Sequence, residues 1–276
     1  GVFNHNALYE VNLAGIDSIE ILRGPASSLY GSNAIGGTLN FLTKAPSLTP
    51  TADLGVSSSS EGYRRLEVGA SNTFDTAYGE HGLRLSAYAS DRGESWQDHA
   101  ESNKQSVTLR HDWRISDATQ VKNIASYNHL KADMTGSLNA NDFSKRQGYS
   151  YQTFTYREVD ATRLSSQLNH SWNEQQKSQM TVYYRDNTTE QNPSYNIRTD
   201  VVSGVPTGTY SGQTTYNAFQ SYGLNVQHSA NFDPVKFTIG VMAEHSPNQA
   251  KTNDIEVFRD PNTLVYTGYK QRQLLR

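Results

Sequence analysis

The chain has no cysteine in its 276 residues, which excludes a disulfide framework and a thiolate metal site. It also has no apolar run approaching the roughly 18 residues of a transmembrane helix. Its net charge of −3 provides no basic surplus of the kind that binds nucleic acid, so we expect no nucleic-acid partner. A polar average does not exclude a membrane, because only alternate residues of a membrane strand face lipid.

Signatures of catalysis are missing as well. The eight histidines are scattered without H-E-x-x-H or another metal-ligand spacing, and no G-x-S-x-G nucleophile elbow occurs. Gly24, Gly31, Gly36 and Gly37 match neither G-x-G-x-x-G nor a Walker loop, and we interpret them as turn glycines. We therefore expect no enzyme, no cofactor and no metal site.

Residues 16–44 contain the most informative pattern. A short apolar strand at residues 18–22 ends at Gly24-Pro25, where proline can open a helix because its missing N–H has no partner there. Gly31 can end that helix in a left-handed conformation. Gly36-Gly37 then provides a bend, and residues 38–43 alternate as a second strand. The predicted unit is a strand, a turn of helix, a glycine bend and a strand.

This unit resembles the end of the plug domain of TonB-dependent outer-membrane receptors, whose signature is I-E-x-[LI]-R-G-P-x-S-x-L-Y-G-x-x-A-x-G-G-x-[LI]-N. The matching residues are Ile19, Glu20, Leu22, Arg23, Gly24, Pro25, Ser27, Leu29, Tyr30, Gly31, Ala34, Gly36, Gly37 and Asn40. The resemblance implies that Arg23 helps to lock the plug to glutamates of the barrel wall, with Glu20 as a local alternative partner. It also implies coupling to TonB through a segment absent here.

The rest of the chain has a different pattern. Residues 46–51 contain Pro46 and Pro50 and fit a linker between a plug at 1–45 and a barrel at 52–276. From residue 51 onward apolar residues alternate with polar ones in runs of about ten, the length that a tilted strand needs to cross a bilayer. We expect an all-β fold: the end of a plug followed by about nine or ten antiparallel strands of an incomplete transmembrane barrel. The chain is therefore interpreted as a fragment of a larger protein.

The connections support this fold. Short turns at 116–119, 173–176 and 233–234 alternate with long polar stretches at 133–157 and 187–216, as periplasmic turns and outer loops do in membrane barrels. Trp113, Trp172 and Phe232 each precede a short turn, which predicts an interfacial aromatic girdle. His111 and His170 lie beside two of these tryptophans and are predicted to be interfacial.

The long stretches are the predicted ligand surface, since tyrosines and arginines suit an anionic aromatic chelate. The candidate ligand residues are Arg146, Tyr149, Tyr151, Arg157, Tyr195 and Arg198. The resemblance implies a monomeric active-transport receptor in the bacterial outer membrane, surrounded by lipid, with a ferric siderophore as the expected cargo. Cobalamin, haem or an oligosaccharide remain alternatives. A passive porin or adhesin barrel is an alternative from another class, and a soluble all-β binding module or carbohydrate enzyme is a further one.

Overall fold

The computed structural model describes residues 11–24, 36–93 and 95–272. Pro25, Tyr30 and Gly31 of the plug motif lie outside these ranges, so the predicted turn of helix between the two plug strands is not part of the description. The described chain is dominated by antiparallel strands, which form one small and one large sheet, as the sequence predicts.

Two strands and a short helix precede the large sheet. A 3₁₀ turn η2 (Leu13–Gly15) leads into β1 (Ile16–Arg23), which pairs with β2 (Gly37–Thr43). Gly24, at φ 94°, continues the chain out of β1, and its N–H donates to the carbonyl of Gly36 at 3.2 Å. This left-handed backbone favours glycine because a Cβ would be strained there. The described part of the plug motif thus forms a strand pair, and a hydrogen bond between its own glycines follows the last paired residues, Arg23 and Gly37.

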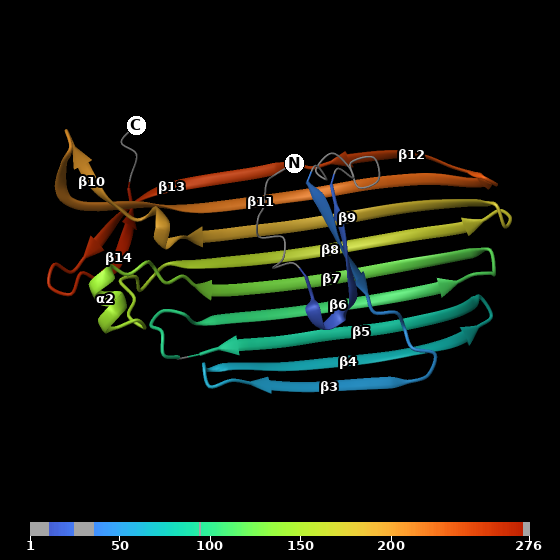
Figure 1. Ribbon diagram of the computed structural model, residues 1–276, viewed down its shortest axis with the longest axis horizontal. Helices are drawn as coiled ribbons and strands as arrows, with labels where there is room; N and C mark the ends of the chain where they lie inside the picture. Colours follow the sequence, from blue (N-terminus) through green and yellow to red (C-terminus); the bar gives the residue numbers. More distant parts are fainter. Residues whose placement is uncertain (1–10, 25–35, 94, 273–276) are drawn as a thin grey trace.

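The large sheet has twelve strands and is built from successive hairpins (Figure 1). Its strands are β3 (Thr51–Ser58), β4 (Tyr63–Thr76), β5 (Gly79–Arg92), β6 (Ser102–Arg114), β7 (Thr119–Asp133), β8 (Tyr156–Ser171), β9 (Gln176–Asn192), β10 (Arg198–Val202), β11 (Val205–Phe232), β12 (Val235–His245), β13 (Asn248–Arg259) and β14 (Tyr266–Gln271). Two short helices, α2 (Ala140–Lys145) and η3 (Ser194–Asn196), lie in the connections.

The order of pairing follows the chain. The sheet has twelve strands where about nine or ten were predicted: ten lie along the path from β3 to β14, and β10 and β12 pair with β11 beside this path. The long β11 pairs with β13 along its first half and with β12 along its second half. Within the described residues, β3 and β14 form the two edges of the sheet, so it is open.

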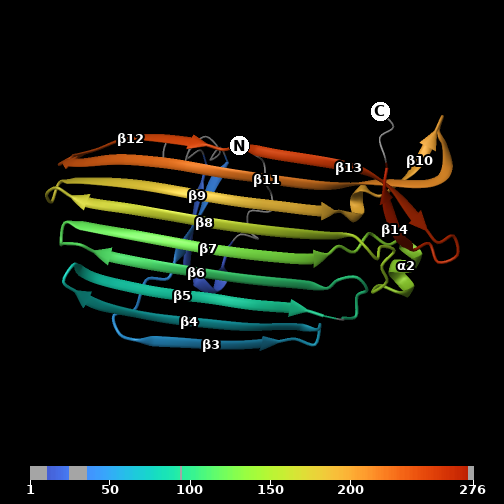
Figure 2. The same ribbon diagram turned by 180° about the vertical axis from the view of Figure 1, so that it is seen from behind.

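The two faces of the sheet differ in chemistry. Thr108 and Arg110 of β6 contact the N-terminal segment, and we call their side of the sheet the plug face. Because successive side chains of a strand point to opposite sides, Leu109 lies on the other side, which we call the apolar face. Figures 1 and 2 show the two sides, with the β1–β2 hairpin over one of them.

The apolar face carries rows of uncovered hydrophobic side chains. One row runs in register across seven strands: Ala70, Leu85, Leu109, Ala125, Leu164, Tyr184 and Tyr222. Leu109 and Leu164 are each 46% exposed, which a water-soluble fold would normally avoid over so wide an area. None of the described helices is long and apolar enough to cross a membrane.

The two ends of the sheet also differ, as the turn lengths predicted. At one end the turns are tight: Ser116 and Thr119 exchange backbone hydrogen bonds, and Trp172 N donates to the carbonyl of Gln176 at 2.9 Å. At the other end lie the connection from β7 to β8, with α2, and the β10–β11 hairpin (Figure 1). We call these the short-turn end and the long-loop end.

The prediction of a long polar connection at residues 187–216 is wrong. The polar stretch at 187–216 is mostly strand, because β9 continues to Asn192 and β11 already begins at Val205. Between them β10 forms a hairpin with β11 whose two loop residues, Ser203 and Gly204, both have positive φ. Such two-residue turns match the twist of the flanking strands. The long-loop end is therefore more regular than the sequence suggested.

The predicted aromatic residues gather at the short-turn end. Trp113 stacks on His81 with ring centroids 5.4 Å apart, and His81 stacks in turn on His111. His170 packs edge-on against Trp172 at 4.4 Å. The side chains of Trp172 and Phe232 are largely exposed. These contacts place His111 and His170 beside aromatic rings at one level of the sheet, whereas their interfacial role stays a prediction.

Two neighbouring glycines at the start of β2, Gly36 and Gly37, allow the strain of a side chain at this position to be tested. Gly37 has φ 151°, and a Cβ there would meet the carbonyl oxygen of Leu22 at 2.5 Å, whereas a Cβ on Gly36 would meet nothing within 4 Å. We expect Gly37→Ala in the full-length protein to destabilise the β1–β2 hairpin by about 1–3 kcal/mol. Faster protease cleavage within this hairpin under native conditions would show it. The Gly36→Ala variant serves as the control, and equal cleavage of both variants would contradict the prediction.

Candidate functional site

The N-terminal segment is seated on the plug face by one buried amide. Asn12, only 4% exposed, caps η2 by accepting from Ala14 N and donates through Nδ2 to the carbonyl of Ser86 (2.9 Å) and to the Thr108 hydroxyl (3.0 Å). Buried polar groups that lose their partners cost roughly 1–3 kcal/mol each. One side chain therefore shapes η2 and fixes it to β5 and β6.

The C-terminal end of the hairpin is held by a guanidinium. Arg110 donates through Nη1 to the carbonyl of Thr43 at 2.5 Å, while its Nε and Nη2 form a two-point ion pair with Asp112. The fixed fork of arginine suits such simultaneous contacts. Because Asp112 neutralises Arg110, the plug contact is a directed hydrogen bond and adds no unpaired charge to the plug face.

The predicted plug residues lie on the hairpin itself. The carboxylate of Glu20 accepts from the Asn40 side chain at 2.9 Å, across the β1–β2 pair. Arg23 is the last residue of β1, and its side chain is exposed within the described structure. The role of Arg23 as a latch to the barrel wall stays a prediction. The side-chain hydrogen bonds between this segment and the sheet come from Asn12 and Arg110, which the motif does not single out.

The connection from β7 to β8 folds around a carboxylate. Asn139 caps the N-terminus of α2 by accepting from Asp142 N at 2.8 Å. The buried Asp142 pairs with Arg146 at 2.9 Å and accepts a hydrogen bond from the Tyr151 hydroxyl. The hydrogen bond from Arg146 is the main cause that lowers the pKa of Asp142 to about 2, with Tyr151 second.

Two further tyrosine contacts complete this cluster. The Arg146 guanidinium lies 3.7 Å from the ring centroid of Tyr149, and the Tyr149 and Tyr151 rings pack edge to face at 5.6 Å. The structure thus brings together three of the predicted ligand residues, Arg146, Tyr149 and Tyr151, and we call them, with Asp142, the Arg146 cluster. A guanidinium over an aromatic ring combines positive charge with a planar surface that a ligand can contact.

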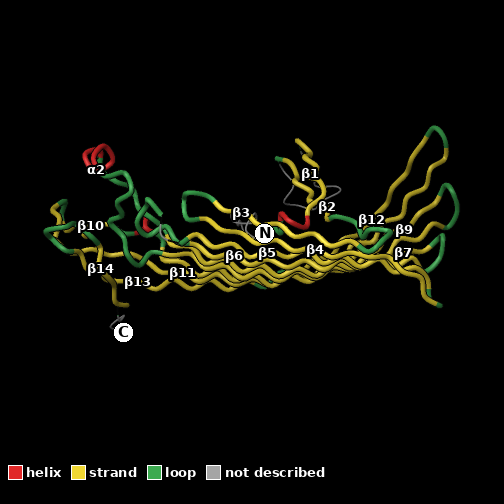
Figure 3. The backbone as a smooth tube through the Cα atoms, turned by 90° about the horizontal axis from the view of Figure 1, so that it is seen from below, coloured by secondary structure: helices red, strands yellow, loops and turns green. Residues whose placement is uncertain are grey.

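A second arginine–tyrosine group lies beside the first. Arg259 at the end of β13 donates to the Tyr210 hydroxyl at 3.0 Å, and its guanidinium lies within about 5 Å of the Tyr210 and Tyr266 ring centroids. Tyr266 N donates to the carbonyl of Tyr151 at 2.6 Å, which joins the two groups. Figure 3 shows α2 on the same side of the sheet as the β1–β2 hairpin. The helix α2, which carries Asp142, therefore lies at the long-loop end on the side of the β1–β2 hairpin.

The other predicted ligand residues are not part of this arrangement. Arg157 donates to the side-chain oxygen of Gln191 at 3.0 Å, on β8 and β9. Tyr195 lies in η3 with 66% of its surface exposed, and Arg198 begins β10 with an exposed side chain. Their ligand contacts stay predictions.

Sequence reasoning missed Asp142, Arg259 and Tyr266. Asn139 followed three residues later by Asp142 is a helix-start pattern that could have revealed the first. Arg259 contacts Tyr210 from 49 residues away, and no local pattern indicates such a pair. Cross-strand register alone brings the β13 and β11 residues together.

The low pKa of Asp142 predicts how the cluster responds to acid. A carboxyl group with a folded pKa of about 2 and an ordinary unfolded pKa near 3.9 stabilises the folded loop fully above about pH 4. That stabilisation is lost as the pH falls from about 4 through 2. In the full-length protein, we expect Asp142→Asn to accelerate pepsin cleavage at residues 134–155 at pH 4. The ratio of variant to wild-type cleavage should approach one near pH 2, and a ratio independent of pH would contradict the assignment.

Comparison with known proteins agrees with this architecture. The family model for the TonB-dependent Receptor Plug Domain matches residues 1–38. The crystal structure of the ferripyoverdine receptor of the outer membrane of Pseudomonas aeruginosa superimposes with a TM-score of 0.70, covering 87% of this chain and 33% of that one at 16% identity. At that identity the likeness concerns the fold alone.

Curated relatives are receptors and transporters by name. The metal-pseudopaline receptor CntO of Pseudomonas aeruginosa (strain UCBPP-PA14) is 32% identical over 39% of this chain and 15% of its own length. The vitamin B12 transporter BtuB of Vibrio cholerae serotype O1 (strain ATCC 39541) is 32% identical over 56% of this chain and 24% of its own length. The matches thus span at most a quarter of these two relatives. The plug-domain match at residues 1–38, together with these relatives, supports a fragment similar to the TonB-dependent receptors.

Proposed function

We propose that this chain is the plug end and part of the barrel of an outer-membrane receptor that actively imports a bulky nutrient, a ferric siderophore. The observation that carries the proposal is the opposition of the two faces: a plug hairpin fixed to one face by Asn12 and Arg110, and rows of uncovered apolar side chains on the other. A barrel closed around a plug needs this division, because its wall faces lipid while its interior holds a folded domain.

The plug contacts also favour active transport over a passive porin. An open pore has no use for a folded segment held inside it, and movement of such a segment needs an energy source. The resemblance to TonB-dependent receptors implies that TonB provides this energy. Import of the cargo that a protonophore abolishes would support active transport. In contrast, swelling of receptor-containing liposomes in sugar solutions would indicate an open pore and contradict the proposal.

The long-loop end supports an anionic aromatic cargo. Arg146 over Tyr149 and Arg259 over Tyr210 and Tyr266 combine positive charge with stacking surfaces, as ferric catecholates require. Arg146 is already paired with Asp142, so much of its charge is balanced, whereas Arg259 contacts tyrosines and the carbonyl of Leu264. Cobalamin, the cargo named for BtuB, is the second candidate, because that relative matches 56% of the chain.

Cargo binding can be tested with the full-length receptor in detergent. We expect one ferric chelate, from a set of ferric catecholates, ferric hydroxamates, cobalamin and haem, to quench tryptophan fluorescence at sub-micromolar concentration. Trp96, in the connection between β5 and β6, is the expected reporter because it lies beside Gly148, which belongs to the loop that carries Arg146. Arg259→Gln and Arg146→Gln should each weaken binding about tenfold, equivalent to about 1.4 kcal/mol.

Two controls make that experiment specific. Lys177→Gln, at the short-turn end of β9, should leave affinity unchanged, and Arg157→Gln tests the predicted residue outside the two clusters. Binding of cobalamin with no iron chelate bound would replace the siderophore by the second candidate. Unchanged affinity in both Arg146→Gln and Arg259→Gln would exclude these clusters as the site.

The membrane-facing role of the apolar face has its own test. Leu109 lies near the middle of this face, and an arginine facing lipid at mid-depth costs about 2–4 kcal/mol. We therefore expect Leu109→Arg to lower the denaturant midpoint of the full-length protein in liposomes. Thr181→Arg on the plug face of β9 is the matched control and should shift it much less. Equal shifts would contradict the assignment of the two faces.

A further inference from the structure

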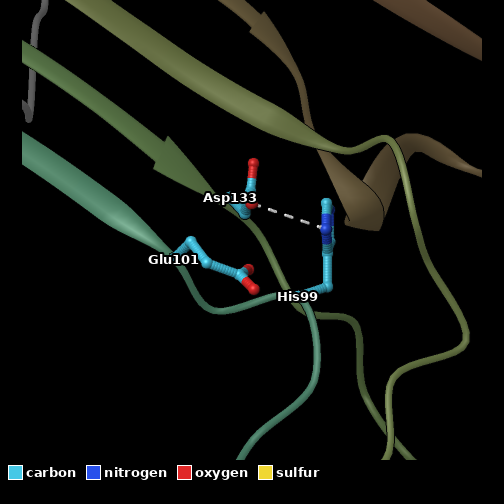
Figure 4. Close-up of side chains that lie close together, drawn as sticks. All are labelled: His99, Glu101 and Asp133. Atoms are coloured by element: carbon cyan, nitrogen blue, oxygen red, sulfur yellow. Dashed lines mark ion pairs between the residues drawn. The ribbon is translucent and has the colours of Figure 1, made fainter. Parts of the chain in front are cut away.

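Three potential metal ligands converge at the long-loop end, outside the two arginine–tyrosine groups. His99 lies in the connection between β5 and β6, Glu101 directly precedes β6, and Asp133 ends β7 (Figure 4). Their ligand atoms all lie within 4.8 Å of one another. No spacing in the sequence reveals this group, because the pairing of β6 with β7 brings Asp133 beside Glu101.

The hydrogen bonds of His99 determine which ring nitrogen is free. Nε2 lies 2.7 Å from the carbonyl oxygen of Thr155, and a carbonyl can only accept, so Nε2 carries a proton. In the neutral ring, Nδ1 then bears a lone pair, and it faces Asp133 Oδ2 at 3.6 Å. Metal-bound histidines characteristically donate their other N–H to a backbone carbonyl in this way, which fixes the tautomer and ring orientation.

Backbone hydrogen bonds hold the residues around this group in place. Thr155 is fully buried, and its carbonyl also accepts from Met134 N at 2.9 Å. Asp133 N donates to the carbonyl of Glu101 at 2.9 Å, which fixes the spacing of the two acidic residues. Backbone contacts therefore set the positions of Thr155, Glu101 and Asp133, and an open hollow lined in part by Glu101, Asn103 and Asp133 leaves the two carboxylates accessible to an ion.

A neighbouring cluster of the same composition shows the contrast. His129, Glu158 and Asp160 also lie close together, but His129 Nδ1 is 2.9 Å from Asp160 Oδ1, a normal hydrogen bond. The same oxygen accepts from the Tyr127 hydroxyl at 2.8 Å. The polar atoms of that cluster are within hydrogen-bond distance of one another. In contrast, His99 Nδ1 and Asp133 Oδ2 are 3.6 Å apart, beyond hydrogen-bond distance.

We propose that His99, Glu101 and Asp133 form a binding site for a divalent first-row transition cation of the Zn²⁺ class. One imidazole nitrogen and two carboxylate oxygens are ligands that such ions accept, and water fills the remaining positions. The bound ion joins the β5–β6 connection to the end of β7 and, through Thr155, to the start of β8. It thereby fixes the base of the loop that carries the Arg146 cluster.

The test is calorimetric titration of the full-length receptor in detergent with ZnCl₂, after removal of metals with a chelator and without any siderophore. Wild type should bind one more equivalent than His99→Asn and Asp133→Asn, or bind it at least tenfold more tightly. Asparagine suits position 99 because His99 has φ 54°, which Asn tolerates. Glu101→Gln, at an exposed position, provides a third variant that keeps every backbone contact.

Glu158→Gln in the neighbouring cluster is the matched control and should leave Zn²⁺ binding unchanged. Identical titrations for wild type and all three ligand variants would overturn the site. Binding of Ca²⁺ as tight as that of Zn²⁺ would overturn the assignment to a transition cation. The outcome is independent of the transported cargo, because no siderophore is present and no residue of the Arg146 cluster is changed.

Discussion

The hydrogen-bond register of the large sheet is the constraint on which the other features depend. Across the apolar rows, the strands carry opposite chemistry on their two sides, and a shift of one residue would exchange the two. Because Leu85, Leu109 and Leu164 are in register, hydrophobic side chains collect on one face. The same register places Thr108 and Arg110 toward the plug. The seat of the plug and the apolar surface are thus two results of one pairing scheme.

Much of this scheme could be predicted from sequence because it is local. Alternation identified the strands, and short turns at 116–119 and 173–176 fixed their order. The failure at 187–216 has a physical reason. Beyond the apolar rows, β9 carries Asp186, Thr188 and Glu190 on the side that earlier holds Met180 and Val182. Both sides of the strand are then polar, so the period-two signal vanishes although the backbone pairing continues.

The candidate sites also differ in whether their residues are close together or far apart in the sequence. Arg146, Tyr149 and Tyr151 lie within six residues of one another and were found as a group because one loop holds them. Arg110 reaches Thr43 across 67 residues, and His99 reaches Thr155 across 56. Such contacts arise from strand order and from the turns that join strands, so residue type alone could not indicate them. The Glu101–Asp133 pair likewise required knowledge of register.

The junction between the β7–β8 connection and β14 has a consequence for how the molecule assembles. Tyr151 accepts from Tyr266 N, Gln152 bridges to Tyr266, and Thr153 donates to the Tyr266 carbonyl. These partners are more than a hundred residues apart, and contacts of such separation form late because the intervening chain must first be ordered. The loop with Arg146 therefore reaches its final position only after β8, β9, β11 and β13 have been laid down. The position of this loop therefore depends on β14 as well as on the two strands that it joins, β7 and β8.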